Sequence, residues 1–335
     1  MSRRSLVTGG GGFIGRHLVR LLVERGEQVR VLDIADAKDL PDGVEFVRGS
    51  ILDAECVAGA LKGVDRLYHL AANPNLWAPD PNDFYETNFR GTETVLAAAA
   101  RTNLERIVYT STESILKSRR RRNPDLIDET VAWTVDDMPG PYCRSKFLAE
   151  QAAIRAAGSG CPVVIVNPTM PIGPGDVNQT PPTRMLLGYL SGSTRAYLEC
   201  HFNLVDARDV AAGHLLAAER GVIGERYILG GTNLRMSEFL AELEQLTGVV
   251  MPSIRIPYFV ALGYAAIDEA WANLTKRPPT APISGVRLTH TPMVFDNSRA
   301  VRDLGLPQTP LRKTLQDAIA WFRQQGLLRN GLITN

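Results

Sequence analysis

Cysteine and histidine are scarce in this chain of 335 residues. The four cysteines, Cys56, Cys143, Cys161 and Cys200, stand far apart and form no C-x-x-C pair. This spacing predicts reduced structural thiols and excludes a disulfide framework. The five histidines show no metal-ligand spacing, so we expect no metal site.

The chain also lacks an excess of charge and a long apolar run. It has 37 basic and 36 acidic residues, which leaves no global field to attract nucleic acid. No apolar stretch approaches the ~20 residues of a membrane-spanning helix, and residues 1–4 leave no room for a signal sequence before the first predicted strand. We therefore expect a cytoplasmic protein with a small-molecule substrate, no nucleic-acid partner and no integral membrane segment.

Strand-like runs alternate with helical patterns through the first half of the chain. The runs cover residues 6–7, 29–32, 44–47, 66–70, 107–109 and 163–166. Such alternation is typical of parallel βαβ units. The fold class predicted here is α/β, with a Rossmann-type, doubly wound parallel sheet.

The pattern changes after Pro168. A proline-rich stretch follows, and helices are predicted over residues 236–247, 257–274 and 311–325. One segment, 203–231, has the apolar pattern of a return to the first domain. We expect a cofactor domain of residues 1–168 plus 204–232, and a smaller, mainly helical substrate domain of residues 169–203 plus 233–335.

A glycine-spaced motif lies where the first predicted strand turns into the first helix. Gly9 permits the tight turn, Gly12 lets phosphates approach backbone N–H groups, and Gly15 lets the helix pack closely on the strand. This context predicts a dinucleotide pyrophosphate site.

Asp33 ends the second predicted strand, 18 residues after Gly15. A carboxylate there accepts hydrogen bonds from the adenosine ribose and repels a 2′-phosphate, which favours NAD over NADP. Arg16 and Lys38 keep NADP open, because either cation is suited to a 2′-phosphate.

Tyr142 and Lys146 stand four apart in a segment of helical composition, so they share one helix face. We expect the ammonium to lower the pKa of the phenol, which would make Tyr142 a general acid and base. Ser111 and Thr112 follow the fifth strand at the ligand-binding edge of the sheet, where a hydroxyl can hold a substrate oxygen. Ordinary turn chemistry is the alternative for these two hydroxyls.

Together these motifs resemble the extended short-chain dehydrogenase/reductases, in a match that runs nearly end to end. The segments that carry the resemblance are Thr8 to Gly15, His69 to Ala72, Asn88 to Thr92, Tyr109 to Thr112, Tyr142 to Lys146, Asn167-Pro168 and Val205 to Asp209. Within this group, the segments 76–80, 140–142, 164–168, 173–176 and 225–231 resemble the hopanoid-associated sugar epimerases, which are near relatives of the dihydroflavonol reductases.

The resemblance implies an enzyme that passes a hydride between nicotinamide and a carbinol carbon of a sugar. Tyr142 would exchange the proton, Lys146 would also hold the nicotinamide ribose, and Thr112 would bind the substrate oxygen. It further implies cofactor contacts from Phe13, Ile14, Ser50, Ile51, Leu70, Ala71, Ala72, Asn88 and Pro168, and substrate contacts from Glu113 and Asn167. His69 is expected to be a packed strand residue.

The chain departs from the family pattern in two places, and other assignments stay open. Ser50 replaces the usual adenine-binding aspartate, which leaves Ser50, Ile51 or Asp53 for that role, and Thr112 replaces the usual serine. Only one acid, Glu113, follows Thr112, whereas a dehydratase needs two, so elimination is disfavoured. A dihydroflavonol-type or hydroxysteroid-type reductase remains an alternative, as does a nonenzymatic dinucleotide sensor.

Three further features allow more than one interpretation. Residues 119–122 are four arginines that fit either a diphosphate site or a solvated loop. The apolar helix 259–274 is expected to pack as ordinary core, with a substrate wall or a membrane contact as alternatives. The Ala-rich helices 83–100 and 142–157 predict an isologous homodimer.

Overall fold

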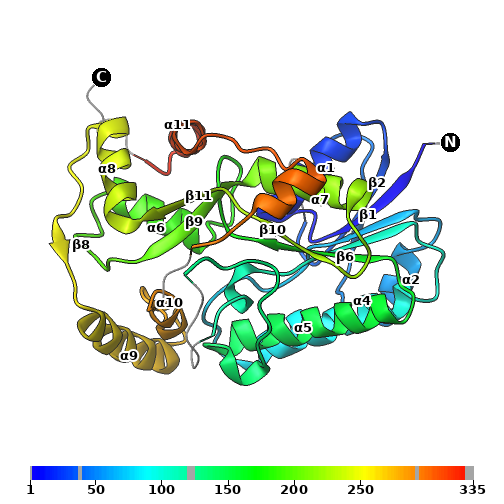
Figure 1. The fold of residues 1–335 in the computed structure, drawn as a ribbon, viewed down its shortest axis with the longest axis horizontal. Helices are drawn as coiled ribbons and strands as arrows, with labels where there is room; N and C mark the ends of the chain where they lie inside the picture. Colours follow the sequence, from blue (N-terminus) through cyan, green and yellow to red (C-terminus); the bar gives the residue numbers. More distant parts are fainter. Residues whose placement is uncertain (1, 37–39, 119–124, 291–293, 329–335) are drawn as a thin grey trace.

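A parallel sheet of seven strands forms the centre of the molecule (Figure 1). The computed structural model describes residues 2–36, 40–118, 125–290 and 294–328. The strands run in the order β10-β6-β5-β4-β1-β2-β3. Their bounds are β1 Arg4–Thr8, β2 Gln28–Asp33, β3 Glu45–Arg48, β4 Arg66–His69, β5 Arg106–Thr110, β6 Val163–Pro168 and β10 Arg226–Leu229. The predicted doubly wound α/β class is confirmed.

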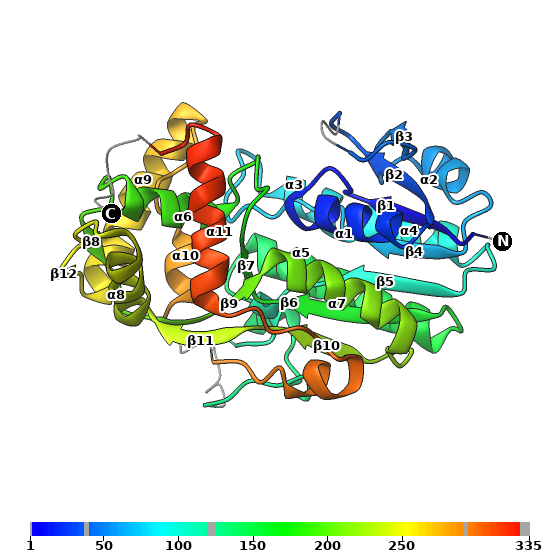
Figure 2. The ribbon, with the colours of Figure 1, turned by 90° about the horizontal axis from the view of Figure 1, so that it is seen from above.

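The inner strands, such as β4 and β6, are buried on both faces, because helices cover each side of the sheet (Figure 2). In β1, Leu6 packs in the core shared with α2, α4 and α5, whereas Val7 packs in the core shared with α1 and α7. Successive side chains of a strand point to opposite faces, so a continuous apolar run suits this position.

The helices of this first region connect the strands and pack on the two faces. They are α1 Phe13–Glu24, α2 Ala54–Ala60, α3 Asn82–Phe84, α4 Gly91–Ala99, α5 Pro141–Gly158 and α7 Ala207–Arg220, with shorter helical turns η1 Tyr85–Arg90, η2 Glu113–Ile115, η3 Val135–Asp137 and η4 Ala300–Leu304. The helix expected over residues 83–100 contains η1, a π-helical turn, between α3 and α4.

The strand order reverses between β1 and β4. The chain builds β1, β2 and β3 outward and then returns to place β4 on the other side of β1. In open α/β sheets, the crevice at the carboxyl ends of the strands beside such a reversal is where ligands bind.

The later part of the chain gathers at one end of the molecule (Figure 2). Its helices are α6 Pro181–Leu190, α8 Met236–Thr247, α9 Tyr258–Thr275, α10 Ile283–Leu288 and α11 Leu311–Gln324. Its strands are β7 Met170–Ile172, β8 Ala196–Tyr197, β9 His201–Asp206, β11 Thr232–Arg235 and β12 Ile254–Arg255. The helices α8, α9 and α11 lie within one residue of their predicted bounds. Of the described helices, none has both the length and the apolar character that crossing a bilayer requires.

Two expectations for this region change. Residues 201–206 form β9, which pairs with β7 and β11 in a separate three-stranded sheet instead of joining the central one. The returning segment reaches the central sheet only afterwards, when α7 packs against α1 and β10 pairs with β6. The expectation that α9 packs as ordinary core is wrong, because Ala265 and Ala272 are its buried residues and most of its large side chains are exposed.

Candidate functional site

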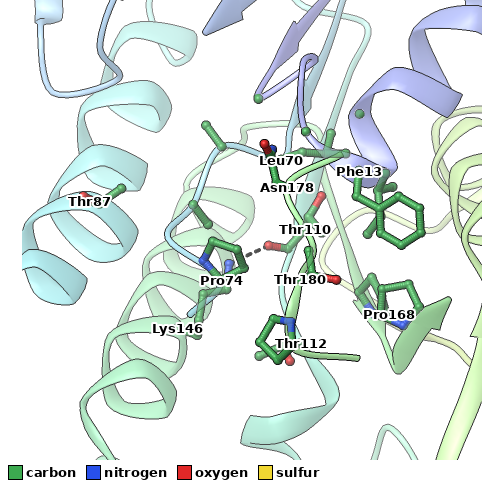
Figure 3. A pocket seen from close by; sticks show the side chains of 18 of the residues that line it. Phe13, Leu70, Pro74, Thr87, Thr110, Thr112, Lys146, Pro168, Asn178 and Thr180 are labelled. Carbon is green, nitrogen blue, oxygen red and sulfur yellow. Dashed lines mark hydrogen bonds between the residues drawn. The ribbon is translucent and has the colours of Figure 1, made fainter. Parts of the chain in front are cut away.

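A cavity of about 950 Å³ lies at the carboxyl edge of the central sheet. Its walls come from the turn after β1, the ends of β2, β5 and β6, and the helices α1, α5, α6 and α10. The cavity therefore lies between the sheet and the helices α6 and α10. It is beside the point where the strand order reverses, between β1 and β4. Figure 3 shows the side chains that approach one another across it.

The glycine turn forms one end of this cavity, as its spacing predicts. Gly9 has a φ of +73° and donates its N–H to Leu32 O at 2.9 Å. A Cβ on Gly15 would lie 2.2 Å from Gly9 O, so only glycine lets α1 approach the turn this closely. Gly12 begins α1, whose first turn carries no acid. The N-terminal end of a helix with this environment suits an anion such as a pyrophosphate.

Asp33 lies at the end of β2 and faces the same cavity. Its carboxylate accepts the N–H of Gly11 at 3.0 Å and the N–H of Ala35 at 3.3 Å. Arg16 also lines this part and donates from Nη2 to Gly11 O at 3.0 Å. Lys38, the other cation considered for a 2′-phosphate, lies outside the described residues.

The candidates for adenine contact differ in how free their side chains are. Ser50 and Ile51 line the cavity. Asp53 does not, because its carboxylate caps α2 by accepting the N–H groups of Glu55 and Cys56. Beyond β4, the cavity wall continues through Leu70, Ala71 and Ala72.

Lys146 projects from α5 toward the end of β5, where Nζ donates to Thr110 O at 2.7 Å (Figure 3). The same Nζ lies 4.8 Å from the centre of the Tyr109 ring. Burial lowers the pKa of Lys146 to about 8, with Glu150 acting in the opposite direction. The ammonium is thus fixed at the floor of the cavity by a carbonyl and an aromatic face.

Tyr142 also lines the cavity, but its pKa differs from the expectation. Burial raises the pKa of Tyr142, the Glu113 carboxylate raises it further, and the Thr112 hydroxyl offsets only part of the rise. Lys146 is not among the groups that shift the pKa of Tyr142. Its ammonium is directed instead to Thr110 O and the Tyr109 ring. Tyr142 is therefore a protonated phenol at neutral pH.

Thr112, Glu113 and Ser114 form a compact polar cluster beside Tyr142. Thr112 Oγ1 donates to Glu113 Oε2 at 2.8 Å, and Ser114 Oγ lies 3.2 Å from Glu113 Oε1. All three residues are buried and line the cavity. Burial raises the pKa of Glu113, although both hydroxyls lower it. Glu113 is thus a buried cavity residue and not a surface one.

Asn88 and Asn167 lie behind the cavity wall and not in it. Asn88 accepts the N–H of Asn73 at 2.7 Å and donates to Ser145 Oγ at 3.0 Å. Asn167 donates to Thr112 O at 3.1 Å and to Glu150 Oε2 at 2.8 Å. Their bonds hold the backbone and neighbours of cavity residues, and they do not place either side chain in the cavity.

Lys117 is a buried cation that no sequence motif indicated. Its side chain is 2% exposed, and Nζ donates to Leu288 O on α10. Burial lowers the pKa of Lys117 to about 8, while Glu113 raises it. No local motif predicts a contact across 171 residues. Ser111, which the sequence did single out, is buried in the wall, and its hydroxyl has no hydrogen-bond partner among the described residues.

The end of the cavity away from the glycine turn is apolar. It is lined by Leu76, Met170, Pro171, Met185 and Leu288, with Thr289 beside Leu288. Among the described lining residues, the cations are Arg16, at the glycine turn, and Lys146, at the floor. The arginines 119–122, considered above for a diphosphate, lie outside the described residues.

His69 has the packed position expected of it. Nδ1 lies 2.7 Å from Thr8 Oγ1, and Nε2 lies 3.0 Å from Thr92 Oγ1. Burial lowers the pKa of His69 to about 3, so the ring is neutral.

Comparisons with known proteins agree with this geometry. Residues 5–230 match the model of the NAD dependent epimerase/dehydratase family. The chain is 39% identical to a putative dihydroflavonol 4-reductase of Synechocystis sp., over 96% of this chain and 95% of that protein. It is 34% identical to sterol demethylase protein B of Methylococcus capsulatus, over 97% and 99%. The dTDP-glucose 4,6-dehydratase DesIV of Streptomyces venezuelae, solved with NAD bound, superimposes with a TM-score of 0.76 at 26% identity, over 98% and 99%.

Proposed function

Because the chain belongs to the NAD dependent epimerase/dehydratase family, we propose that Tyr142 is the acid and base of an NAD-dependent hydride transfer at a carbinol or keto carbon. The protein is an enzyme of the extended short-chain dehydrogenase/reductase group. One observation carries the assignment of residues: the glycine turn, Thr112, Tyr142 and Lys146 line one cavity.

The cavity suits NAD at the end formed by the glycine turn. A Cβ on Gly12 would lie 3.1 Å from Gly9 O and would occupy the space in front of the start of α1. We assign the pyrophosphate to the backbone N–H groups there and the adenosine ribose to Asp33, with Ser50, Ile51 and Leu70 to Ala72 along the same wall. When bound, NAD supplies the hydride donor or acceptor.

The proton moves through the protein's own hydroxyl groups. Tyr142 Oη, protonated at neutral pH, gives its proton to a keto oxygen in reduction and takes a proton back in oxidation. The Thr112 hydroxyl, which donates to Glu113 in this structure, rotates to donate to the substrate oxygen and so orients it. The Ser111 hydroxyl, which has no partner among the described residues, is a second possible donor to that oxygen. Lys146 holds the nicotinamide ribose from the floor. Asn167 positions Thr112 through the bond to its carbonyl.

The test replaces Tyr142 with Phe. We expect turnover to fall by about 10²–10⁴-fold, the usual contribution of a positioned acid or base, while NAD affinity stays within a few-fold of wild type. Turnover is followed by NADH absorbance and binding by calorimetry. Tyr264→Phe, which changes an exposed tyrosine of α9, is the matched control. Full activity of the Tyr142→Phe enzyme would remove the residue from the mechanism.

Two net reactions fit these groups. The sugar epimerase predicted from the sequence retains its cofactor through the reaction, whereas a ketone reductase exchanges it. The apolar end of the cavity favours a reductase whose substrate is an apolar ring or chain. The described residues that line this end include no cation that could bind the diphosphate of a nucleotide sugar. Two relatives are named for ring compounds of that kind, a putative dihydroflavonol 4-reductase and sterol demethylase protein B.

These alternatives differ in cofactor retention and substrate choice. A reductase exchanges its cofactor with free NADH and reduces apolar cyclic ketones. An epimerase is purified with NAD in place and converts a nucleotide sugar without net NADH change. Retained NAD together with epimerisation of UDP-glucose would decide for the epimerase.

We also propose a cytoplasmic homodimer in which α4 and α5 meet their counterparts in a second copy. These helices pack side by side, as the superfamily interface would require. Light scattering should give twice the chain mass of 36.7 kDa. We propose a cofactor domain of residues 1–168 plus 204–232 and a substrate domain of residues 169–203 plus 233–335, of which η4 packs back on α7 and β10. The pairing of β10 with β6 supports it.

A further inference from the structure

α9 lies at the edge of the molecule (Figure 1) and carries many exposed apolar side chains. Its exposed side chains include Val260, Tyr264, Ile267, Trp271 and Leu274, which recur every three or four residues. Ile267 is 74% exposed, Trp271 65% and Leu274 76%. Residues at this spacing share one face of a helix. A continuous apolar face of this kind marks a surface that meets a partner or a membrane.

The charges of α9 are arranged around this apolar face and not on it. Asp268 and Glu269 are its two acids, and both turn inward. Asp268 Oδ2 accepts the N–H of Ala281 at 2.8 Å, and Glu269 Oε2 accepts the N–H of Ile283 at 2.8 Å. They hold the start of α10 against α9.

Cations lie at both ends of the helix. Arg255 precedes α9, and Lys276 and Arg277 follow it, all three exposed. The exposed face of α9 is therefore apolar in the middle and basic at each end. This is the charge pattern of helices that lie in the headgroup region of an anionic bilayer, and aromatic side chains such as Phe259, Tyr264 and Trp271 are enriched at that depth.

A second copy of the chain fits this surface less well. In a parallel pairing, Lys276 and Arg277 meet their own counterparts. In an antiparallel pairing, they meet Arg255. Either arrangement places like charges together, since the acids of α9 are engaged with the chain before α10. Anionic phospholipid supplies the opposite charge at both ends.

We propose that α9 docks the enzyme on the surface of an anionic phospholipid bilayer, with the helix lying in the headgroup region. α10 packs against α9, and Gly285 and Leu288 of α10, with Thr289 directly after it, line the cavity. The docked surface thus lies one helix away from the apolar end of the cavity, so an apolar molecule in the bilayer would have a short route to it.

The test is co-sedimentation of the full chain with vesicles of phosphatidylcholine and phosphatidylglycerol at 3:1, compared with pure phosphatidylcholine. We expect binding to the anionic vesicles that falls steeply with salt. Ile267→Asp should lower the partition coefficient by about tenfold or more, because it places a charge in the apolar face. Ile223→Asp, which changes an exposed isoleucine after α7, should leave it unchanged.

Two further measurements separate the outcomes. The double change Lys276→Gln with Arg277→Gln should weaken binding several-fold without affecting activity toward a water-soluble substrate. Emission from Trp271, isolated by subtracting the spectrum of Trp271→Phe, should shift to the blue on vesicles. No vesicle binding, binding that Ile267→Asp leaves intact, or a halved solution mass for Ile267→Asp without vesicle binding would each overturn the proposal. The last result would assign the surface to a second copy.

Discussion

Gly15→Ala isolates the part of the site that depends on close approach. Gly15 lies in the first turn of α1, and its backbone is not in the left-handed region that disfavours side chains. Helix propensity alone would therefore make alanine favourable here by about 0.5–1 kcal/mol. Space is the obstacle, since the added Cβ would lie 2.2 Å from Gly9 O and 2.8 Å from Gly10 Cα.

Both of those atoms belong to the backbone and cannot rotate away. Overpacking of this kind costs typically about 1–3 kcal/mol. After the gain in propensity, we expect a net loss of up to about 2.5 kcal/mol in the free energy of unfolding. The larger effect falls on NAD, because relief of the clash requires α1 to move away from the turn that would hold the pyrophosphate.

Urea denaturation with and without NAD measures both effects. At a concentration of 100 Kd, NAD should stabilise the wild type by about 2.7 kcal/mol and the variant by much less. Gly59→Ala is the matched control, since a Cβ in that position of α2 meets nothing within 4 Å. An unfolding midpoint and an NAD response equal to wild type in Gly15→Ala would refute the close-approach argument.

Two further predictions follow from buried charges. The Glu113 carboxylate raises the pKa of Tyr142, so Glu113→Gln should shift the part of the pH profile of kcat/KM that reports Tyr142 ionisation to lower pH. An unchanged pH profile would contradict an electrostatic effect of Glu113 on Tyr142. Lys146→Met should be more stable than wild type at pH 7, because the pKa of Lys146 is about 8 in the fold and 10.5 normally. Between pH 8 and pH 10.5, Lys146 is protonated in the unfolded chain but largely neutral in the folded protein, so the free energy of unfolding of the wild type rises with pH. The difference in stability between Lys146→Met and the wild type should therefore become smaller by pH 10.5. Urea melts at both pH values check this, and a constant gap would count against a buried ammonium.

The elements that the sequence predicted well are those whose signal is local. The glycine spacing, Asp33 at the end of β2, and the Tyr142 and Lys146 pair on α5 each depend on residues within one βα unit or one helical turn. Backbone sterics and helical periodicity act over that range, so spacing alone carries the information.

The features that the sequence did not display depend on contacts between distant segments. Asn88 and Asn167 belong to family motifs, yet their amides bond to Ser145 and Thr112 behind the cavity wall. The pKa of Tyr142 rises because burial and the Glu113 carboxylate outweigh the hydrogen bond from Thr112. Such balances depend on where each group is placed in three dimensions.

The amino-acid sequence by itself determined a dinucleotide-binding α/β chain with a tyrosine and a lysine on one helix face, because short-range periodicity and steric demands encode those features. The tertiary structure alone decided which groups share the cavity, that its far end is apolar, and that α9 exposes its apolar face. Burial and electrostatic balance arise from long-range packing, which the order of residues along the chain does not display.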